Sequence, residues 1–496
     1  MSRALLTIAL TALVVLAGCS AIDGGDAGTP TPTVSAPTDA PETTDRPGDT
    51  NAETTERTTP SVTAASGTTT PTDGGSSPDD RIGRENGYAY DDPIAVTPDD
   101  GFNESEFEAL KARTMARVER IRGREFESDV SVRFITRETL LAEGLFTFEE
   151  DPARNQLWEA AFVVGEDETA AAESNELYDV VVDGYAGRDE LTLVVENPER
   201  PRIDPAILAH ELAHVLGGPR LRIDGYDGSV DERLVVRSVS EGNANFVEAR
   251  YADRCAADWS CVERPPNATD VADFEGVNEG LFLWFAAPYT LGPDLLAQQY
   301  EERGIEGVNG VYSTPPASME QVIHPATYPD ETPTAVDIED RSTDGWNRQR
   351  ATRRSATNTL GEAVLYAMFK SNDVIGGPEP DINKAQRTGL NYSHPATAGW
   401  DGDTFAAYSN GSAGAYVLKT AWDTDRDARE FHATYLDLLE SNGAIEVDDG
   451  VYRIPDGPYA DAFRVVRDGD RVIVVNAPTV EALDEIHPAD GCVGTR

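Results

Sequence analysis

Apolar and polar positions divide the chain into an N-terminal part without a core and a patterned part that begins near Tyr88. Ala4–Leu16 is one short apolar run, and residues 20–80 carry almost no large apolar side chain. Such a polar segment cannot bury enough surface to offset the entropy lost on ordering. We therefore expect a disordered Thr/Pro/Ser/Asp-rich stalk over 19–85 and a folded part after it.

Helical periodicity dominates the next stretch. Apolar positions three and four apart predict a helix over 107–123, capped by Asn103 or Ser105. Asp204-Pro205 is typical of a helix start, and that helix should end at Gly217-Gly218-Pro219. The other elements expected before residue 341 are helices over 137–144, 233–251 and 276–303, strands over 131–136 and 191–195, and a Pro-rich loop over 315–333.

The pattern becomes richer in strands after about residue 341. Alternation predicts strands over 403–408 and 413–422, and a hairpin turns at Asp468-Gly469. The remaining elements are the two hairpin strands, 463–466 and 471–475, and helices over 359–369, 424–439 and 480–486. The fold class is therefore α+β, with a mostly helical part over 86–340 and a strand-richer α+β domain over 341–496.

The N-terminus has the features of a secretion signal. Arg3 precedes the apolar run, which is shorter than the roughly 20 residues of a membrane span. The small residues before Cys19 resemble a lipobox, so we expect residues 1–18 to be removed and Cys19 to carry a lipid. A plain secretion signal with an incidental cysteine is the alternative. Since no later run of about 18 apolar residues exists, Cys19 would be the only membrane anchor, at the extracellular face.

Composition excludes several kinds of partner. The 496 residues carry 89 acidic and 41 basic side chains, a net charge of −48, and only four lysines. Phosphate contacts need a basic face, so we expect no nucleic-acid binding and no polybasic contact with anionic lipid. Molar salt screens the self-repulsion of such a chain, so the composition indicates a halophile.

The cysteines and asparagines fit an extracellular setting. Cys255 and Cys261 could close a small disulfide loop, which leaves Cys492 without a partner. The chain has no CxxC pair, so we do not expect cysteine-bound zinc. The possible N-glycosylation sites are Asn103, Asn267, Asn391 and Asn410.

The main chemical signal is the sequence His210-Glu211-Leu212-Ala213-His214. Residues i and i+4 lie on one face of a helix, so the two imidazoles can share one metal ion, and Zn²⁺ prefers such ligands. Glu211 would lie beside them as a general base. The alternative is a pair of core histidines, each of which would then need its own hydrogen-bond partner.

A catalytic zinc site needs a third protein ligand. The metzincin pattern fails, because Arg220 stands where its third histidine would be. Glu241 is the preferred ligand, since the 26 residues after His214 allow a loop and an antiparallel helix, and Gly242 allows close helix contact. Asp227, with Asp224, is the alternative.

These residues resemble the gluzincin type of zinc metallopeptidase, with HELAH on one helix and a glutamate on the next. More narrowly, the chain is similar to a family of largely uncharacterised secreted HExxH proteins of archaea and bacteria, in a haloarchaeal surface-lipoprotein branch. Three further segments carry the resemblance, at 315–325, 398–403 and 421–424. It covers roughly residues 100–490 and implies a zincin-like fold for 86–340. Relatives tend to follow HExxH with a polar stretch, whereas this chain has Val-Leu-Gly-Gly-Pro.

A peptidase of this type needs a donor that stabilises the oxyanion. His324 and Tyr328 are the candidates, and a purely structural role for His324 is equally open. The sequence thus favours a membrane-anchored, extracellular zinc peptidase acting on peptides or proteins. The alternatives are a cell-surface structural or binding lipoprotein with a non-catalytic metal site and a solute-binding lipoprotein.

Overall fold

The computed structural model describes residues 81–187, 189–217, 228–264, 276–343, 345–352, 354–377 and 390–489. They form a mixed α+β structure, which confirms the predicted fold class at this level. The predicted signal peptide, residues 19–80 of the predicted stalk with Cys19, and Asp224, Asp227, Asn267 and Cys492 lie outside the described residues. Residues 81–85, expected to belong to the disordered stalk, are instead ordered and include the short strand β1, Arg84–Glu85.

The first part of the chain is mostly helical around a small sheet. Strands β3 and β5 run parallel, and β4 pairs antiparallel with β5 at the edge. Its elements are β1 Arg84–Glu85, β2 Tyr88–Ala89, the 3-10 helix η1 Pro98–Asp100, α1 Glu104–Arg122, β3 Ser131–Ile135, α2 Arg137–Glu143, α3 Pro152–Ala160, α4 Ala170–Val181, β4 Gly184–Ala186, β5 Glu190–Val194, α5 Pro205–Gly217, α6 Val230–Ala257, α7 Glu279–Arg303, α8 Ile305–Ser313 and α9 Met319–Ile323.

The second part is built on an antiparallel sheet of seven strands in the order β6-β7-β8-β12-β11-β10-β9. Its elements are β6 Asn347–Arg348, α10 Glu362–Ser371, β7 Trp400–Ser409, β8 Gly414–Trp422, α11 Asp425–Ser441, β9 Ile445–Asp448, β10 Val451–Arg453, β11 Ala462–Asp468, β12 Arg471–Ala477 and α12 Leu483–Ile486.

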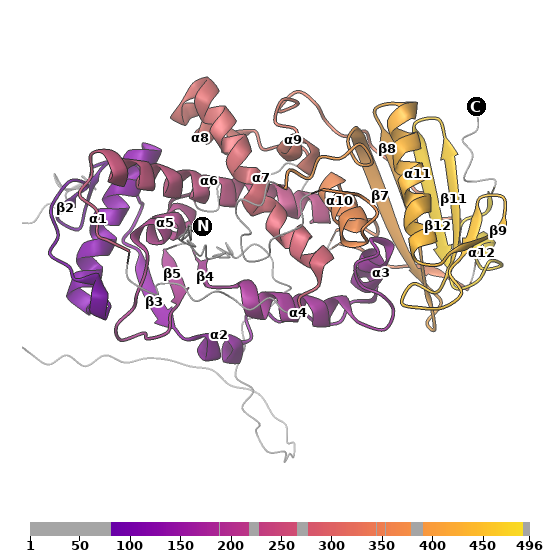
Figure 1. Ribbon diagram of the computed structural model, residues 1–496, viewed down its shortest axis with the longest axis horizontal. Coiled ribbons are helices and arrows are strands. Elements are labelled where there is room, and N and C mark those ends of the chain that lie inside the picture. Colours follow the sequence, from indigo (N-terminus) through magenta and orange to yellow (C-terminus); the bar gives the residue numbers. More distant parts are fainter. Residues whose placement is uncertain are drawn as a thin grey trace, which may run out of the picture.

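The molecule is elongated, with the two sheets towards opposite ends (Figure 1). The long helices α6 and α7 cross the region between them, and α11 covers one face of the seven-stranded sheet. Helix α3, from the first part, packs on β7 and β8 of that sheet. The two parts therefore make direct contact along their boundary.

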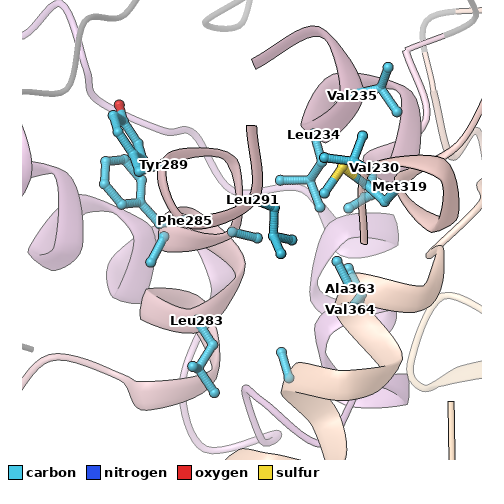
Figure 2. Close-up of a cluster of buried hydrophobic side chains, with 14 of the residues drawn as sticks. Val230, Leu234, Val235, Leu283, Phe285, Tyr289, Leu291, Met319, Ala363 and Val364 are labelled. Carbon is cyan, nitrogen blue, oxygen red and sulfur yellow. The ribbon is translucent and has the colours of Figure 1, made fainter. Parts of the chain in front are cut away.

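A continuous apolar core joins these elements. Figure 2 shows Val230 and Leu234 of α6, Leu291 of α7, Met319 of α9 and Val364 of α10 in one cluster, and all five are buried. The same core extends from α1 to β12. It holds α6 and α7 rigidly, and these helices position the site described below.

Local sequence signals explain most element ends, and a few expected boundaries were wrong. Asn103 caps α1 by accepting the Glu106 N–H at 3.0 Å, as one of the two expected caps. Helix α10 begins at Glu362 rather than at residue 359, because the backbone N–H groups of Leu360 and Gly361 donate to buried Asp403, each at 2.8 Å. The expected loop over 315–333 contains the short helix α9.

A disulfide closes the loop after α6, and a buried arginine of α1 holds that loop. Cys255 and Cys261 are bonded, with Cα atoms 5.5 Å apart. Arg117 of α1 donates to the Ser260 carbonyl at 2.9 Å and lies over the ring of Trp259. Cation–π contact and charge-assisted hydrogen bonds together hold the loop after α6 against the core.

Within the part of the chain that the structure describes, no helix is both long enough and apolar enough to cross a membrane.

Candidate metal centre

Helix α5 presents two histidines on one buried face. Its first turn is capped by Asp204, whose carboxylate accepts the Ala206 N–H at 2.9 Å. Apolar residues bury the rest of the helix. The four-residue spacing brings His210 Nε2 to 3.3 Å from His214 Nε2, so both imidazoles face one point.

Helix α6 returns along α5 and brings Glu241 to that point. Two glycines permit the close approach of α6 to α7: a Cβ on Gly242 would lie 2.5 Å from the Gly292 carbonyl oxygen, and one on Gly292 would collide with the Ser238 carbonyl. Asn243 Nδ2 donates to the Ala213 carbonyl at 3.3 Å and ties α6 to α5. Backbone packing therefore sets the position of Glu241.

Three ligand atoms converge at the site. Glu241 Oε2 lies 3.6 Å from His210 Nε2 and 3.4 Å from His214 Nε2. Two ligands on a tetrahedral ion with bonds of about 2.0–2.1 Å are about 3.3 Å apart, close to these three separations. Glu241 Oε2 is buried and has no hydrogen-bond partner of good geometry among the described residues. The donor set thus fits one metal ion.

Helix α6 also orients both imidazoles. Glu248 Oε2 lies 3.2 Å from His210 Nδ1, and Ser240 Oγ lies 3.1 Å from His214 Nδ1. Such partners on the outer ring nitrogen direct the other nitrogen at a metal. Sequence reasoning missed both residues. Glu248 could have been found as an acid seven residues after Glu241, on the same helix face.

The side chains of the centre have strongly displaced pKa values. Burial alone would lower the pKa of His210, but hydrogen bonds with Glu241 and Glu248 and the charges of Glu211 and Glu248 outweigh it and raise that pKa to about 10. Burial would raise the pKa of Glu241, but the two imidazoles lower it to about 2. The cluster therefore favours positive charge at its centre.

Glu211 lies beside this centre without a hydrogen bond of its own. Its side chain is 0% exposed, and neither carboxylate oxygen has a partner among the described residues. Burial raises its pKa, against the lowering effect of His210 and His214. Strand β4 passes close by, since a Cβ on Gly184 would lie 3.9 Å from the Glu211 carboxyl carbon. A buried carboxylate without a partner is suited to accept a proton.

Tyr312 of α8 is a further polar group that sequence reasoning missed. A Cβ on Gly217, at the end of α5, would lie 3.1 Å from its hydroxyl oxygen. Burial raises the pKa of Tyr312 to about 12; Arg122 lowers it and the charge of Glu241 adds to the rise. The tyrosine is therefore protonated at neutral pH and can donate a hydrogen bond.

The two oxyanion candidates from the sequence have other contacts. His324 ends α9, with Nε2 3.1 Å from Glu362 Oε1 on α10. The Tyr328 hydroxyl donates to the Thr314 carbonyl at 2.5 Å. Neither side chain contacts His210, His214 or Glu241 in the described structure.

Among the possible glycosylation sites, Asn391 and Asn410 are exposed. Asn103 is engaged as the cap of α1.

Comparison with known proteins gives one match. Residues 347–487 match the model of a family described as a domain of unknown function, DUF8575. This range runs from β6 to the end of α12 and so includes the seven-stranded sheet. No curated protein and no solved structure matches the chain. The metal centre lies outside the matched range.

Proposed function

We propose that this protein is a zinc-dependent peptidase of the gluzincin-like HExxH type. The observation that carries the proposal is the set of three ligand atoms, 3.3 to 3.6 Å apart, beside a buried carboxylate that has no hydrogen-bond partner among the described residues. Two imidazoles and one carboxylate form a known ligand set of catalytic zinc, which leaves one position open for chemistry.

His210, His214 and Glu241 would hold the ion. When bound, Zn²⁺ supplies a positive charge that acidifies water and polarises a peptide carbonyl. Glu248 and Ser240 keep the Nε2 atoms directed inward by their contacts with the Nδ1 atoms.

Glu211 would move the proton. One of its carboxylate oxygens accepts a proton from the attacking water and later gives it to the leaving amine nitrogen. Its burial raises its pKa, and that makes the carboxylate a better base. Tyr312 is the donor we propose for the developing oxyanion, because its hydroxyl lies beside Gly217 at the end of α5, near enough for the charge of Glu241 to raise its pKa, and is protonated at neutral pH.

The sequence before residue 81 suggests where this activity would take place. The apolar run before Cys19 and the polar stalk favour a lipid-anchored protein on the extracellular face of the membrane of a halophilic archaeon. Its substrates would be peptides or proteins in that space.

A second candidate is a cell-surface structural or binding lipoprotein with a non-catalytic metal site. The burial of the ligands favours it, because His210, His214 and Glu241 are only 1%, 5% and 2% exposed. A closed site is typical of structural zinc.

A single substitution separates the two. Glu211→Gln keeps the shape of the side chain and removes the base, so it should retain zinc and lose about 10²–10⁴-fold in hydrolysis of a library of internally quenched peptides in molar KCl. Glu176→Gln, on the exposed face of α4, is the matched control and should cleave like the wild type. Tyr312→Phe should lose about 10²–10³-fold without loss of zinc. A zinc-loaded wild-type chain that cleaves no peptide, or a Glu211→Gln variant with full activity, would refute the peptidase.

A further inference from the structure

A second cluster of metal-ligating side chains lies where helix α3 meets the seven-stranded sheet (Figure 1). Glu159 of α3, Glu166 of the following loop and Asp461 before β11 each place a carboxylate oxygen within 4.8 Å of the other two. Glu159 and Asp461 are buried, whereas Glu166 is exposed to solvent. The cluster shares no residue with the His210 site.

No basic side chain of the described residues forms an ion pair with any of these three acids. Two buried carboxylates and a third beside them repel one another in a medium of low dielectric constant. Glu159 and Asp461 also hydrogen-bond to each other, so a proton shared between them offsets part of this repulsion, and a cation held by all three acids would replace that proton. Three neighbouring acids alone do not indicate a cation site, but the neutral side chains beside them provide an independent observation.

Two amide side chains beside the cluster leave buried oxygens without hydrogen-bond partners among the described residues. Asn476 of β12 is 0% exposed; its Nδ2 donates to Asp461 Oδ2 at 2.8 Å, and its Oδ1 has no partner there. Gln156 of α3, which is partly buried, donates from Nε2 to Glu159 Oε2 at 2.7 Å and likewise leaves its Oε1 without a partner. Rotation of either side-chain amide by 180° would exchange its nitrogen and oxygen, so that the oxygen would lie next to the carboxylate.

Tyr416 of β8 completes the surroundings. Its side chain is 0% exposed, and its hydroxyl lies beside that of Tyr435 with no hydrogen bond of good geometry. Both Glu159 and Asp461 act on this hydroxyl through their charge. A buried polar atom without a partner is rare in folded proteins, and the described residues of this cluster include two, Asn476 Oδ1 and Gln156 Oε1.

The oxygen-only ligand set indicates a hard cation, and the separations of the carboxylate oxygens are compatible with Ca²⁺. Ca²⁺ takes six to eight oxygen ligands at about 2.3–2.6 Å, so oxygens on opposite sides of it are about 4.6–5.2 Å apart. Oxygens within 4.8 Å of one another can therefore share one Ca²⁺. Mg²⁺ has bonds of about 2.0–2.1 Å and demands a tighter octahedron. The cluster offers only oxygen ligands, which hard cations prefer over zinc.

We propose that Glu159, Glu166 and Asp461 bind one Ca²⁺, with the side-chain oxygens of Asn476, Gln156 and Tyr416 as further ligands. The ion would join α3 of the first part to β8, β11 and β12 of the second. The backbones already meet there, since the Glu166 N–H donates to the Pro458 carbonyl at 2.8 Å. A bound Ca²⁺ would thus lock the part that carries the His210 site onto the part that matches DUF8575.

The test is calcium binding and thermal unfolding of the full, zinc-loaded chain in molar KCl. Radioactive ⁴⁵Ca²⁺ in equilibrium dialysis should show one bound ion per chain, and millimolar CaCl₂ should raise the unfolding temperature. Glu166→Gln changes only the exposed ligand, should fold like the wild type, and should weaken Ca²⁺ binding by about tenfold or more. Glu159→Gln with Asp461→Asn should abolish binding and the thermal response.

Without calcium the double variant should unfold at the wild-type temperature or above it, because the like-charge repulsion is gone. Glu320→Gln is the matched control, since it changes one buried acid of another three-carboxylate group, Glu320, Glu331 and Asp423, and it should keep the full calcium response. A wild-type chain that binds no Ca²⁺ overturns the proposal. So does a calcium response that survives in the double variant or disappears in Glu320→Gln.

Discussion

At the residue scale, the imidazole partners decide how well the candidate centre is organised. Both contacts come from one helix, α6, which also supplies Glu241. A buried imidazole without such a partner could rotate or change tautomer, so the ligand atom would leave its place. The quality of the centre therefore depends on residues that need not touch the ion.

We expect Glu248→Gln and Ser240→Ala each to weaken zinc binding by about 10–100-fold while leaving the fold intact. Competition with a chromophoric chelator measures the affinity. Asp253→Asn lies on the exposed face of the same helix and should bind zinc like the wild type. Unchanged affinity in both site variants would mean that these contacts do not orient the ligands.

His324 has a different role at the same scale. It faces Glu362, which is completely buried on α10, and the charges of Glu331 and Asp423 also act on it. The hydrogen bond with Glu362 raises the pKa of His324 above its usual value, although burial opposes this. The protonated imidazole thus compensates a buried carboxylate.

This pKa shift predicts a pH dependence with a definite sign. The folded pKa lies above the unfolded value of 6.5, so the stabilisation is complete below pH 6.5 and fades as pH rises through the folded pKa. The unfolding free energy of the wild type should therefore fall as pH rises into the alkaline range. In His324→Gln this fall should be smaller, and denaturant titrations at several pH values measure the difference.

His432→Gln provides a control of opposite sign. Burial and Arg467 lower the pKa of His432, so its contribution to stability is lost as pH falls. If His324→Gln leaves the alkaline slope of the unfolding free energy unchanged, the Glu362 pair does not contribute to stability.

The sequence predicted part of this site, and the limit has a physical reason. A helical i,i+4 histidine pair has a fixed geometry, so His210, Glu211 and His214 could be assigned from local spacing. The structure brings Glu241 to them, but Glu248 was one acid among 89. The sequence did not predict the partner of His324 either, because Glu362 comes from α10, 38 residues further along the chain.

At the element scale, helices with their own caps and apolar faces were the predictable part. Asn103 and Thr424 cap α1 and α11 by accepting backbone N–H groups, as their sequences indicated. Helices α3, α4 and α8 and strand β4 were missed. Strand β4 has only three residues, and its place at the sheet edge depends on pairing with β5, so no local pattern marks it.

The crossing of α6 and α7 makes a prediction about helix packing. Gly292→Ala places a methyl group against the Ser238 carbonyl, one turn before Glu241. We expect it to lower the unfolding free energy by about 1–3 kcal/mol, as overpacking does, and to weaken zinc binding because Glu241 moves.

The control is Gly376→Ala, since a Cβ at Gly376 would meet no atom within 4 Å. Denaturant unfolding and chelator competition should separate the two variants. A Gly292→Ala protein with wild-type stability and zinc affinity would show that the helices can move apart without consequence.

At the scale of the whole molecule, charge sets the working conditions. A net charge of −48 repels itself over the Debye length, which is about 10 Å at 0.1 M salt and about 3 Å at 1 M. Packing in the core that joins both parts must stabilise the fold against this repulsion. Salt screens the repulsion, so the fold is destabilised less at high salt.

The unfolding temperature of the full chain should therefore rise steeply with KCl between about 0.1 and 1 M. Choline chloride at equal ionic strength should also raise the unfolding temperature, whereas sucrose should not reproduce the effect of salt. An unfolding temperature that is independent of salt would contradict the halophile interpretation of the composition.

The most direct measurement for the central claim is the zinc content of the full chain, purified in molar KCl, with Glu241→Ala and Asp227→Ala beside it. We expect about one zinc per chain, retained by Asp227→Ala and lost or strongly weakened in Glu241→Ala. No zinc in a folded wild-type chain, or a loss caused by Asp227→Ala alone, would contradict the His210, His214 and Glu241 centre.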